Sequence, residues 1–165
     1  MYTECALTTT AMDPKTFLAS DKEDMRNRFR MVIEAEGPIL DDLLEKRVLH
    51  SYGLFKRGNR IQPFLDEVLD EVDAEKTIQV SADKKEHTIY WPSAYAGKDK
   101  TEFRECRIPS QRDITEIPVC EVANLMRSLG IRQKEKLFDM TAKQLGFKKK
   151  GSNIRKTFSL AYTLI

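Results

Sequence analysis

Five basic residues fall within the eleven positions of GFKKKGSNIRK, residues 146–156. Ammonium and guanidinium groups at this density bind phosphate oxygens, and neighbouring hydroxyl and amide groups add hydrogen bonds to a nucleic-acid backbone or base edge. From residue 131 to residue 156 the chain has nine Lys or Arg against two acids, although its overall net charge is only +2. The candidate contacts to nucleic acid are Lys148, Lys149, Lys150, Ser152, Asn153, Arg155 and Lys156.

A second stretch, GLFKRGNRIQP at residues 53–63, has a similar pattern of glycines, basic residues and isoleucine. Its candidate contacts are Lys56, Arg57 and Arg60. Residues 61–75 that follow hold six acids and no Lys or Arg, and these acids would repel phosphate. We therefore expect this copy to contact nucleic acid at most through its turn and through Lys84 and Lys85. Two other interpretations of this copy are that it docks on a protein, or that its acidic residues are an ordinary solvated helix face.

The two stretches belong to a longer internal repeat. At an offset of 93 residues, six of the 25 positions from 37 to 61 are identical to their counterparts. Chance gives about one or two such identities, so the chain is interpreted as a duplication. The matching residues of the first copy are Gly37, Leu44, Gly53, Lys56, Gly58 and Ile61.

Apolar residues at helical spacing predict three helices in each copy, with a basic turn between the second and the third. In the first copy these helices begin near Asp21, Asp41 and Ile61, and Pro63 must lie in the first turn of the third. Alternation over residues 76–80 and 87–91 then predicts a hairpin. Three helices followed by a two-stranded hairpin are typical of a winged helix, and three helices alone of a helix-turn-helix unit.

The predicted fold class is therefore α+β and mostly α, with two winged-helix or helix-turn-helix units in tandem. We expect an N-terminal extension at 1–16, a first winged-helix unit at 17–92, a linker at 93–112 and a second unit at 113–165. Because the chain ends at Ile165, the second unit is expected to lack its wing.

Composition narrows the class of protein. The 165 residues are 41% hydrophobic, which suffices for a folded core. Three cysteines without a CxxC pair are typical of reduced thiols in the cytoplasm. No apolar run approaches the ~20 residues of a membrane span, and the N-terminus does not read as a signal peptide, so we expect no membrane partner.

No pattern of residues predicts catalysis. The chain has no GxxxxGK[ST] motif, and its two histidines, His50 and His87, are not near a cysteine in the sequence. Asp83 and Lys85 match half of a metal-dependent nuclease motif, but they fall in a predicted turn. Tyr90 and Trp91 are interpreted as the lid of a small core and not as a base-stacking platform. We predict no catalytic residue, no metal and no cofactor.

Several phrases resemble one known family: VIEAEGPILDDLLEKRV, YGLFKRGNRI, IYWP, FREC, RIPSQRDITEIP and LGF. They are similar to an uncharacterised bacterial domain at the C-terminal end of very large superfamily-1 helicase-like proteins, often after a nuclease-like segment. The resemblance implies a tandem winged-helix module attached to a DNA-processing motor. The motor itself is absent from this sequence, so no ATPase activity is carried over, and the second wing of the family is missing.

The expected function is a non-catalytic module that binds nucleic acid, DNA above all, and serves a helicase or nuclease system. Two alternatives stay open at this stage: a protein-docking module on such a motor, and a winged-helix transcription regulator. The sequence leaves the oligomeric state and the choice between duplex and single strand undecided.

Overall fold

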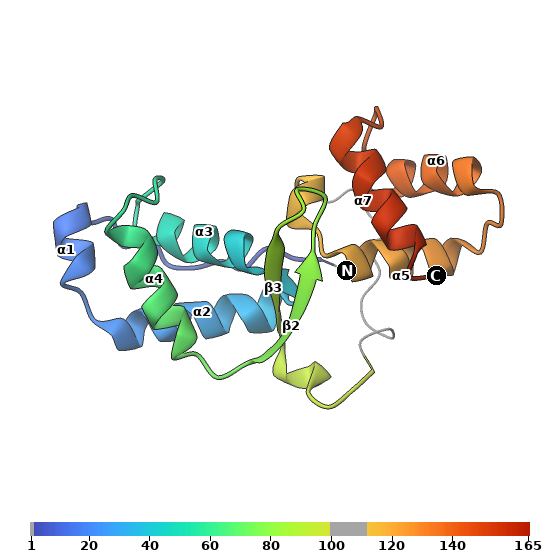
Figure 1. Cartoon of the computed structure of the whole chain (residues 1–165). Coiled ribbons are helices and arrows are strands. Elements are labelled where there is room, and N and C mark those ends of the chain that lie inside the picture. The colour runs from blue at the N-terminus through green and yellow to red at the C-terminus, as the bar shows by residue number, and fades with distance from the viewer. Residues whose placement is uncertain (1, 100–111) are drawn as a thin grey trace.

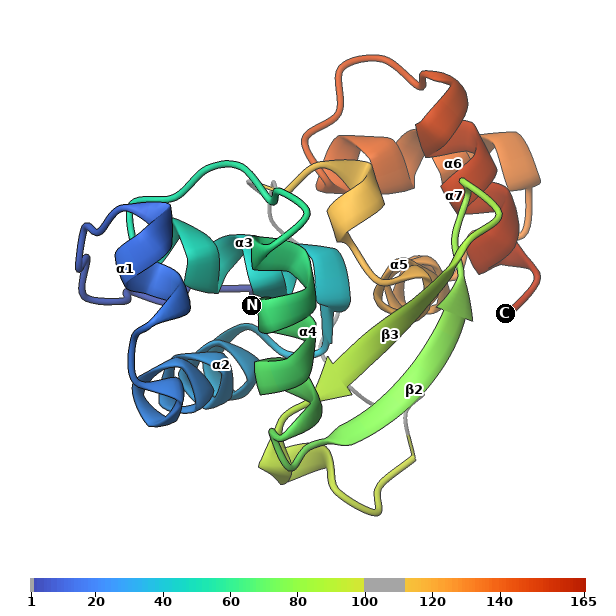
Figure 2. The same ribbon diagram turned by 60° about the vertical axis from the view of Figure 1, so that its left-hand side comes forward.

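The computed structural model describes residues 2–99 and 112–165, which form two helical units on either side of a small sheet (Figure 1). The predicted class, α+β and mostly helical, is confirmed. Figure 2 shows the sheet between α2–α4 on one side and α5–α7 on the other. Within the described ranges, no helix has both the length and the apolar composition that a membrane crossing requires.

The first unit has the element order of a winged helix. Its elements are α1 (Pro14–Leu18), α2 (Lys22–Glu36), β1 (Ile39–Leu40), α3 (Asp41–Ser51), α4 (Ile61–Asp70), β2 (Glu75–Val80) and β3 (Glu86–Trp91). Both strand pairs are antiparallel, and the order across the sheet is β1-β3-β2. The two-residue strand β1, between the first two main helices, closes the sheet against α3, and the sequence pattern did not predict it.

The residues expected to begin helices in this unit have that role in the structure. The side chain of Asp21 accepts a hydrogen bond from the backbone N–H of Glu23 at 2.9 Å and caps α2. Pro63 is the third residue of α4, where a missing N–H costs no helical hydrogen bond. The helix α1 was not predicted, and it spans the boundary expected between residues 16 and 17.

The second unit consists of three helices, α5 (Val119–Leu129), α6 (Lys134–Gln144) and α7 (Ser152–Tyr162). Two short 3-10 turns, η1 (Ser93–Tyr95) and η2 (Ile114–Glu116), lie on either side of the gap in the described chain. The expected linker, 93–112, is therefore described only at its ends, and residues 100–111 lie outside the described structure.

The 93-residue repeat is visible in the backbone. At this offset the bounds of α3 coincide with those of α6, and Gly53 coincides with Gly146. Both glycines have positive φ, 71° and 80°, and both follow their helix. In each copy the next residue donates its N–H back into the helix, Leu54 to Leu49 at 3.3 Å and Phe147 to Ala142 at 2.9 Å. The same left-handed helix end thus sets the direction of both basic turns.

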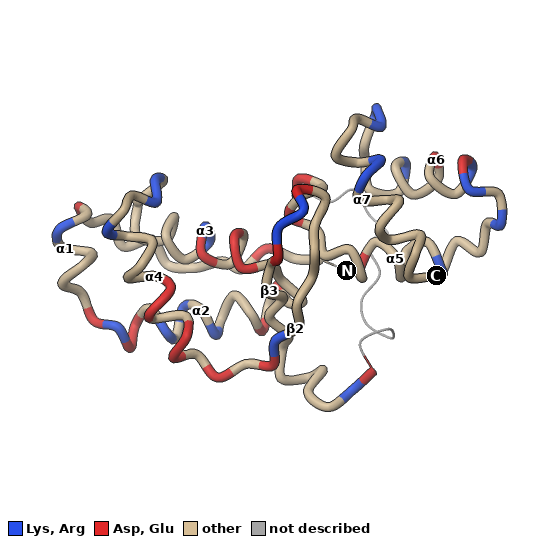
Figure 3. The backbone as a smooth tube through the Cα atoms, viewed as in Figure 1, with Lys and Arg blue, Asp and Glu red and all other residues tan. Residues whose placement is uncertain are grey.

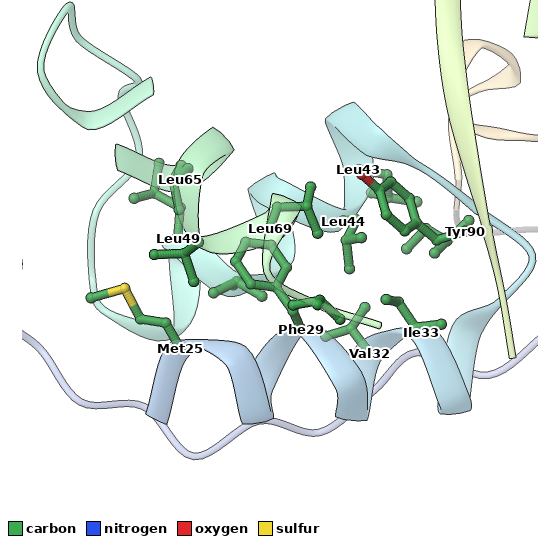
Figure 4. Close-up of a cluster of buried hydrophobic side chains, with 14 of the residues drawn as sticks. Met25, Phe29, Val32, Ile33, Leu43, Leu44, Leu49, Leu65, Leu69 and Tyr90 are labelled. Carbon is green, nitrogen blue, oxygen red and sulfur yellow. The ribbon is translucent and has the colours of Figure 1, made fainter. Parts of the chain in front are cut away.

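Each unit has its own apolar core. Figure 4 shows how α2, α3, α4 and β3 contribute to the first, with the side chains of Met25, Phe29, Val32, Ile33, Leu43, Leu44, Leu49, Leu65, Leu69 and Tyr90 labelled. The second core is built around Val122, Leu125, Met126, Leu137, Phe138 and Phe158. Tyr90 and Trp91 are 5% and 2% exposed, so their interpretation as core residues is confirmed.

The two units pack directly against each other. A small apolar cluster between them consists of Leu40, Ile89 and Trp91 from the first unit with Cys120 from α5. The side-chain oxygen of Gln79 accepts a hydrogen bond from the backbone N–H of Val119 at 2.8 Å, at the start of α5. On the surface, Lys46 donates to Glu116 at 2.8 Å. The hairpin of the first unit therefore serves as the platform for the second.

The N-terminal segment adds a polar link. The hydroxyl of Tyr2 donates to Glu36 at 3.0 Å and accepts from Arg47 at 2.9 Å, both in the first unit. The guanidinium of Arg112 lies 3.8 Å from the centre of the Tyr2 ring and pairs with Glu121 of α5 at 2.8 and 3.1 Å. The side chains of Arg112 and Glu121 are 1% and 0% exposed.

Glu121→Gln is expected to lower the free energy of unfolding by about 3–5 kcal/mol, because it removes one charge of a buried ion pair. Urea unfolding followed by circular dichroism measures this. Lys46→Ala is the matched control, since it breaks an exposed pair worth at most about 1 kcal/mol. Equal losses in the two variants would contradict the assigned role of the buried pair.

Gly37→Ala is expected to destabilise the fold by about 1–3 kcal/mol, the usual cost of overpacking. A Cβ there would lie 2.4 Å from the carbonyl oxygen of Ile33 and 2.6 Å from the ring of Pro92. Gly58→Ala is the control, because a Cβ at Gly58 meets no atom within 4 Å. Urea midpoints of both variants, compared with the parent, give the result; a harmless Gly37→Ala would show that this corner is loosely packed.

Candidate nucleic-acid interface

The basic turn of the second unit presents two lysines to solvent. Lys148 and Lys149 are exposed, and neither forms an ion pair with any residue that the structure describes. The turn leads into α7, whose first residues Ser152, Asn153, Arg155 and Lys156 are also exposed. The leading end of α7 is therefore open to a ligand, as the proposed contact requires.

Lys150 differs from its neighbours and corrects the expectation of three equivalent phosphate anchors. Its ammonium group donates to Asp139 of α6 and lies 3.9 Å from Glu135, and its side chain is only 18% exposed. Arg155 lies 3.8 Å from Glu135 but keeps about half of its side chain exposed. Lys150 thus ties the turn to α6, and its charge is already balanced.

Arg57 shows the same behaviour in the first unit. Its guanidinium pairs with Glu45 at 2.9 Å and with Asp42 at 3.2 Å. At the 93-residue offset Arg57 matches Lys150, and Asp42 matches Glu135. Both copies therefore fold a turn cation back onto an acid in the first turn of the preceding helix, so Arg57 has a structural role and is not a free contact.

The other two cations of the first basic turn are Lys56 and Arg60. Both are exposed and form no ion pair within the described chain. Lys56 matches Lys149 in the repeat, so each copy exposes a lysine at one equivalent position. The structure adds Lys15 of α1, which borders the same open depression of about 720 Å³ as Lys56 and Arg60. Sequence reasoning missed Lys15 because α1 was not predicted.

These free cations lie along one edge of the molecule. Figure 3 shows basic segments at the turn before α4, near the tip of the β2–β3 wing, where acids lie beside them, and at the turn before α7, all toward the upper edge of that view. The acids of α4 and of the segment after it lie at the lower edge. The exposed basic residues of these three turns that form no ion pair within the described chain are Lys56, Arg60, Lys84, Lys85, Lys148 and Lys149, which we call the basic edge.

One flank of α7 faces the first unit. Asn153 and the buried Thr157 line a cleft of about 400 Å³ together with Arg57, Asp83 and His87. Asn153 is exposed as well as lining this cleft, so its contact with nucleic acid stays a prediction. Ser152, Arg155 and Lys156 are not among the residues that line this cleft.

His87 fastens the wing at this cleft. Its Nδ1 lies 3.2 Å from Asp41 at the start of α3, and its Nε2 lies 3.1 Å from Asp83 in the wing turn. Burial lowers the pKa of His87, but the hydrogen bonds with Asp83 and Asp41 outweigh this effect and raise the pKa above its usual value. The imidazolium form satisfies both carboxylates, so protonated His87 holds the wing against α3.

Two sets of side chains in the described ranges belong to types that can support chemistry. Ligand atoms of Asp41, Asp42 and His87 lie within 4.8 Å of one another, but Asp41 also accepts the backbone N–H of Thr88 at 3.0 Å. The cluster thus also links α3 to β3 through hydrogen bonds. Burial raises the pKa of the Cys120 thiol to about 12, which disfavours the nucleophilic thiolate.

Comparison with known proteins gives one match. A family described as a protein of unknown function, DUF3320, matches residues 16–63, from α1 through α3 and the first basic turn into the start of α4. The first unit thus resembles an uncharacterised domain. No curated protein and no solved structure gives a significant match.

Stability should depend on pH through His87. Because the folded-state pKa is raised, the contribution of His87 is complete below the unfolded value of about 6.5 and is lost as pH rises through the folded pKa. The stability difference between the parent and His87→Gln is therefore expected to shrink between about pH 5.5 and pH 8.5.

His50→Gln is the matched control for this measurement. Burial, with help from Lys46 and Arg47, lowers the pKa of His50, so its contribution is present above the unfolded value and is lost as pH falls. Urea titrations at several pH values should thus give opposite trends for the two variants. A parallel trend would rule out the assigned wing contact.

Proposed function

We propose that this chain is a non-catalytic module that binds nucleic acid, DNA in particular, through the basic edge. The observation that supports this best is the pair of equivalent lysines, Lys56 and Lys149, exposed at the same position of two helix-turn-helix turns. In helix-turn-helix proteins this region approaches the phosphate backbone. The free lysines of the wing extend the same edge between the two turns.

The arrangement favours backbone contacts over base reading. Lys148 and Lys149 precede the first turn of α7, where the positive end of the helix dipole adds to their attraction for phosphate. Arg155 and Lys156 are one turn further along and can reach the same strand. If about four to six phosphates are neutralised, log K falls with log salt at a slope of roughly −4 to −5. Binding of this kind is salt-sensitive and weakly selective for sequence.

The wider setting of the module is a proposal from resemblance. Sequence phrases that resemble the C-terminal domain of helicase-like proteins support an accessory role in a bacterial helicase or nuclease system. The cysteine content supports a location in the cytoplasm. Docking on such a motor is the second candidate, favoured by the acidic α4. No observation in the structure favours the third alternative, a transcription regulator.

The double variant Lys148→Ala/Lys149→Ala should weaken binding to a generic duplex by about 100-fold at ~0.1 M salt and reduce the salt slope by about 2, one unit for each lost phosphate contact. Fluorescence anisotropy with a labelled 20-base-pair duplex at four salt concentrations measures both quantities.

Lys150→Ala is the matched control, because it removes a lysine whose charge Asp139 already balances. We expect Lys150→Ala to reduce the salt slope by less than half of the reduction that the single variants Lys148→Ala and Lys149→Ala cause. A parent protein that gives no salt-dependent signal with duplex or single strand would overturn the proposal. Equal reductions of the salt slope in Lys150→Ala and Lys149→Ala would overturn the assignment of free and paired cations.

A further inference from the structure

The strand β2 lies at the edge of the sheet, and its outer side pairs with no strand among the described residues. It is six residues long, or about 20 Å at the usual rise per residue. An open edge of this length offers backbone N–H and C=O groups to another extended chain. In Figure 2 this edge lies on the side of the sheet turned toward the viewer.

Two well-exposed apolar side chains of the described structure lie on β2. Ile78 is 63% exposed and Val80 is 54% exposed, and both point to the same face because they are two residues apart. The opposite face is occupied, since Thr77 accepts a hydrogen bond from Trp91 and Gln79 accepts one from Val119. The exposed pair is thus the uncovered half of an otherwise packed strand.

The neighbouring surface is acidic. Residues 61–75, which include α4 and lead into β2, contain six acids and no Lys or Arg. Glu67 and Glu71 are balanced by Lys22 and Arg26 of α2. Asp70 and Asp73 form no ion pair within the described chain and lie just before the strand.

The acids crowd one another where α3 and α4 meet the sheet. Burial, together with the proximity of Asp66, raises the pKa of Glu45 to about 7, although Gln62 and Arg57 bind the same carboxylate. Burial raises the pKa of Tyr90 in β3 to about 12, with Asp41 and Asp70 contributing. A cation from outside the chain would relieve this excess of negative charge.

We propose that β2 and the acids before it form a docking site for an extended segment of a partner protein, in which apolar β-branched residues at alternate positions are flanked at the ends by Lys or Arg. The segment adds as a fourth strand beside β2. Its apolar residues cover Ile78 and Val80, and its cations reach Asp70 and Asp73 at the start of the strand. This site is separate from the basic edge, so the two proposals can fail independently.

Charge decides between this occupant and two others. Phosphate would be repelled by the acids before β2, so nucleic acid does not fit the surface. Two copies of β2 paired side by side would cover the apolar residues but bring no surplus cation to Asp70 or Asp73, because Lys76 is the one base in each strand. A segment with apolar residues at alternate positions and cations at its ends satisfies both features, because its apolar side chains share the face of Ile78 and Val80 while one end lies beside the start of β2.

A nine-residue synthetic peptide with alternating Val and Thr at its centre and two Lys at each end (the Lys peptide) tests the proposal, and the same peptide with Glu in place of Lys (the Glu peptide) is its control. NMR titration of the full chain, labelled with ¹⁵N, should shift the amides of residues 75–80 with the Lys peptide and leave them unchanged with the Glu peptide. Ile78→Thr/Val80→Thr and Asp70→Asn/Asp73→Asn should each weaken binding at least tenfold. Met31→Thr, at an exposed apolar residue of α2, should not change it.

Circular dichroism of each variant shows that the fold is retained, since threonine preserves strand propensity and asparagine preserves side-chain size. Equal binding of both peptides, no binding of either, or shifts confined to another surface would overturn the proposal. Sedimentation of the chain alone adds a further check. A dimer that Ile78→Thr/Val80→Thr dissolves would identify a second copy as the occupant and overturn it as well.

Discussion

The arrangement of the two units depends on a buried ion pair beneath an aromatic ring. Arg112 and Glu121 neutralise each other where almost no solvent reaches them, and Tyr2 covers the guanidinium while its hydroxyl stays bonded to the first unit. A lone charge at this depth would be very costly, so the pair forms only when the N-terminal segment, Arg112 ahead of η2, and α5 come together. This contact and the apolar cluster around Trp91 fix the second unit on the hairpin of the first.

The two copies of the internal repeat are held in one arrangement by these contacts, so their surfaces can be compared. Both copies have the same helix end and a cation of the turn paired with an acid of the preceding helix. The third helix of one copy is acidic, whereas that of the other follows three lysines. The two copies thus combine a similar local geometry with opposite electrostatic character, as expected if one binds a polyanion and the other a protein partner.

The sequence predicted the main helices and the hairpin because their signals are local: apolar periodicity, the Asp21 cap, and glycine at two left-handed helix ends. It did not predict β1 or α1, because a two-residue strand and a five-residue helix are stabilised by what they pack against, not by their own pattern. For the site, sequence identified the basic turns but could not distinguish Lys149 from Lys150. That difference depends on where Asp139 points, and Arg57 is likewise paired with Glu45 and Asp42 of α3.

The separation of acidic α4 from the basic edge has a consequence for motion in solution. A nearly neutral molecule gains little from long-range attraction, but one whose charges are segregated has a large dipole moment and experiences a torque in an external field. Near any highly charged polymer this torque turns the molecule before surfaces touch, which reduces the rotational search that precedes a productive collision. Added salt shortens the range of this alignment to about one Debye length, ~8 Å at physiological ionic strength.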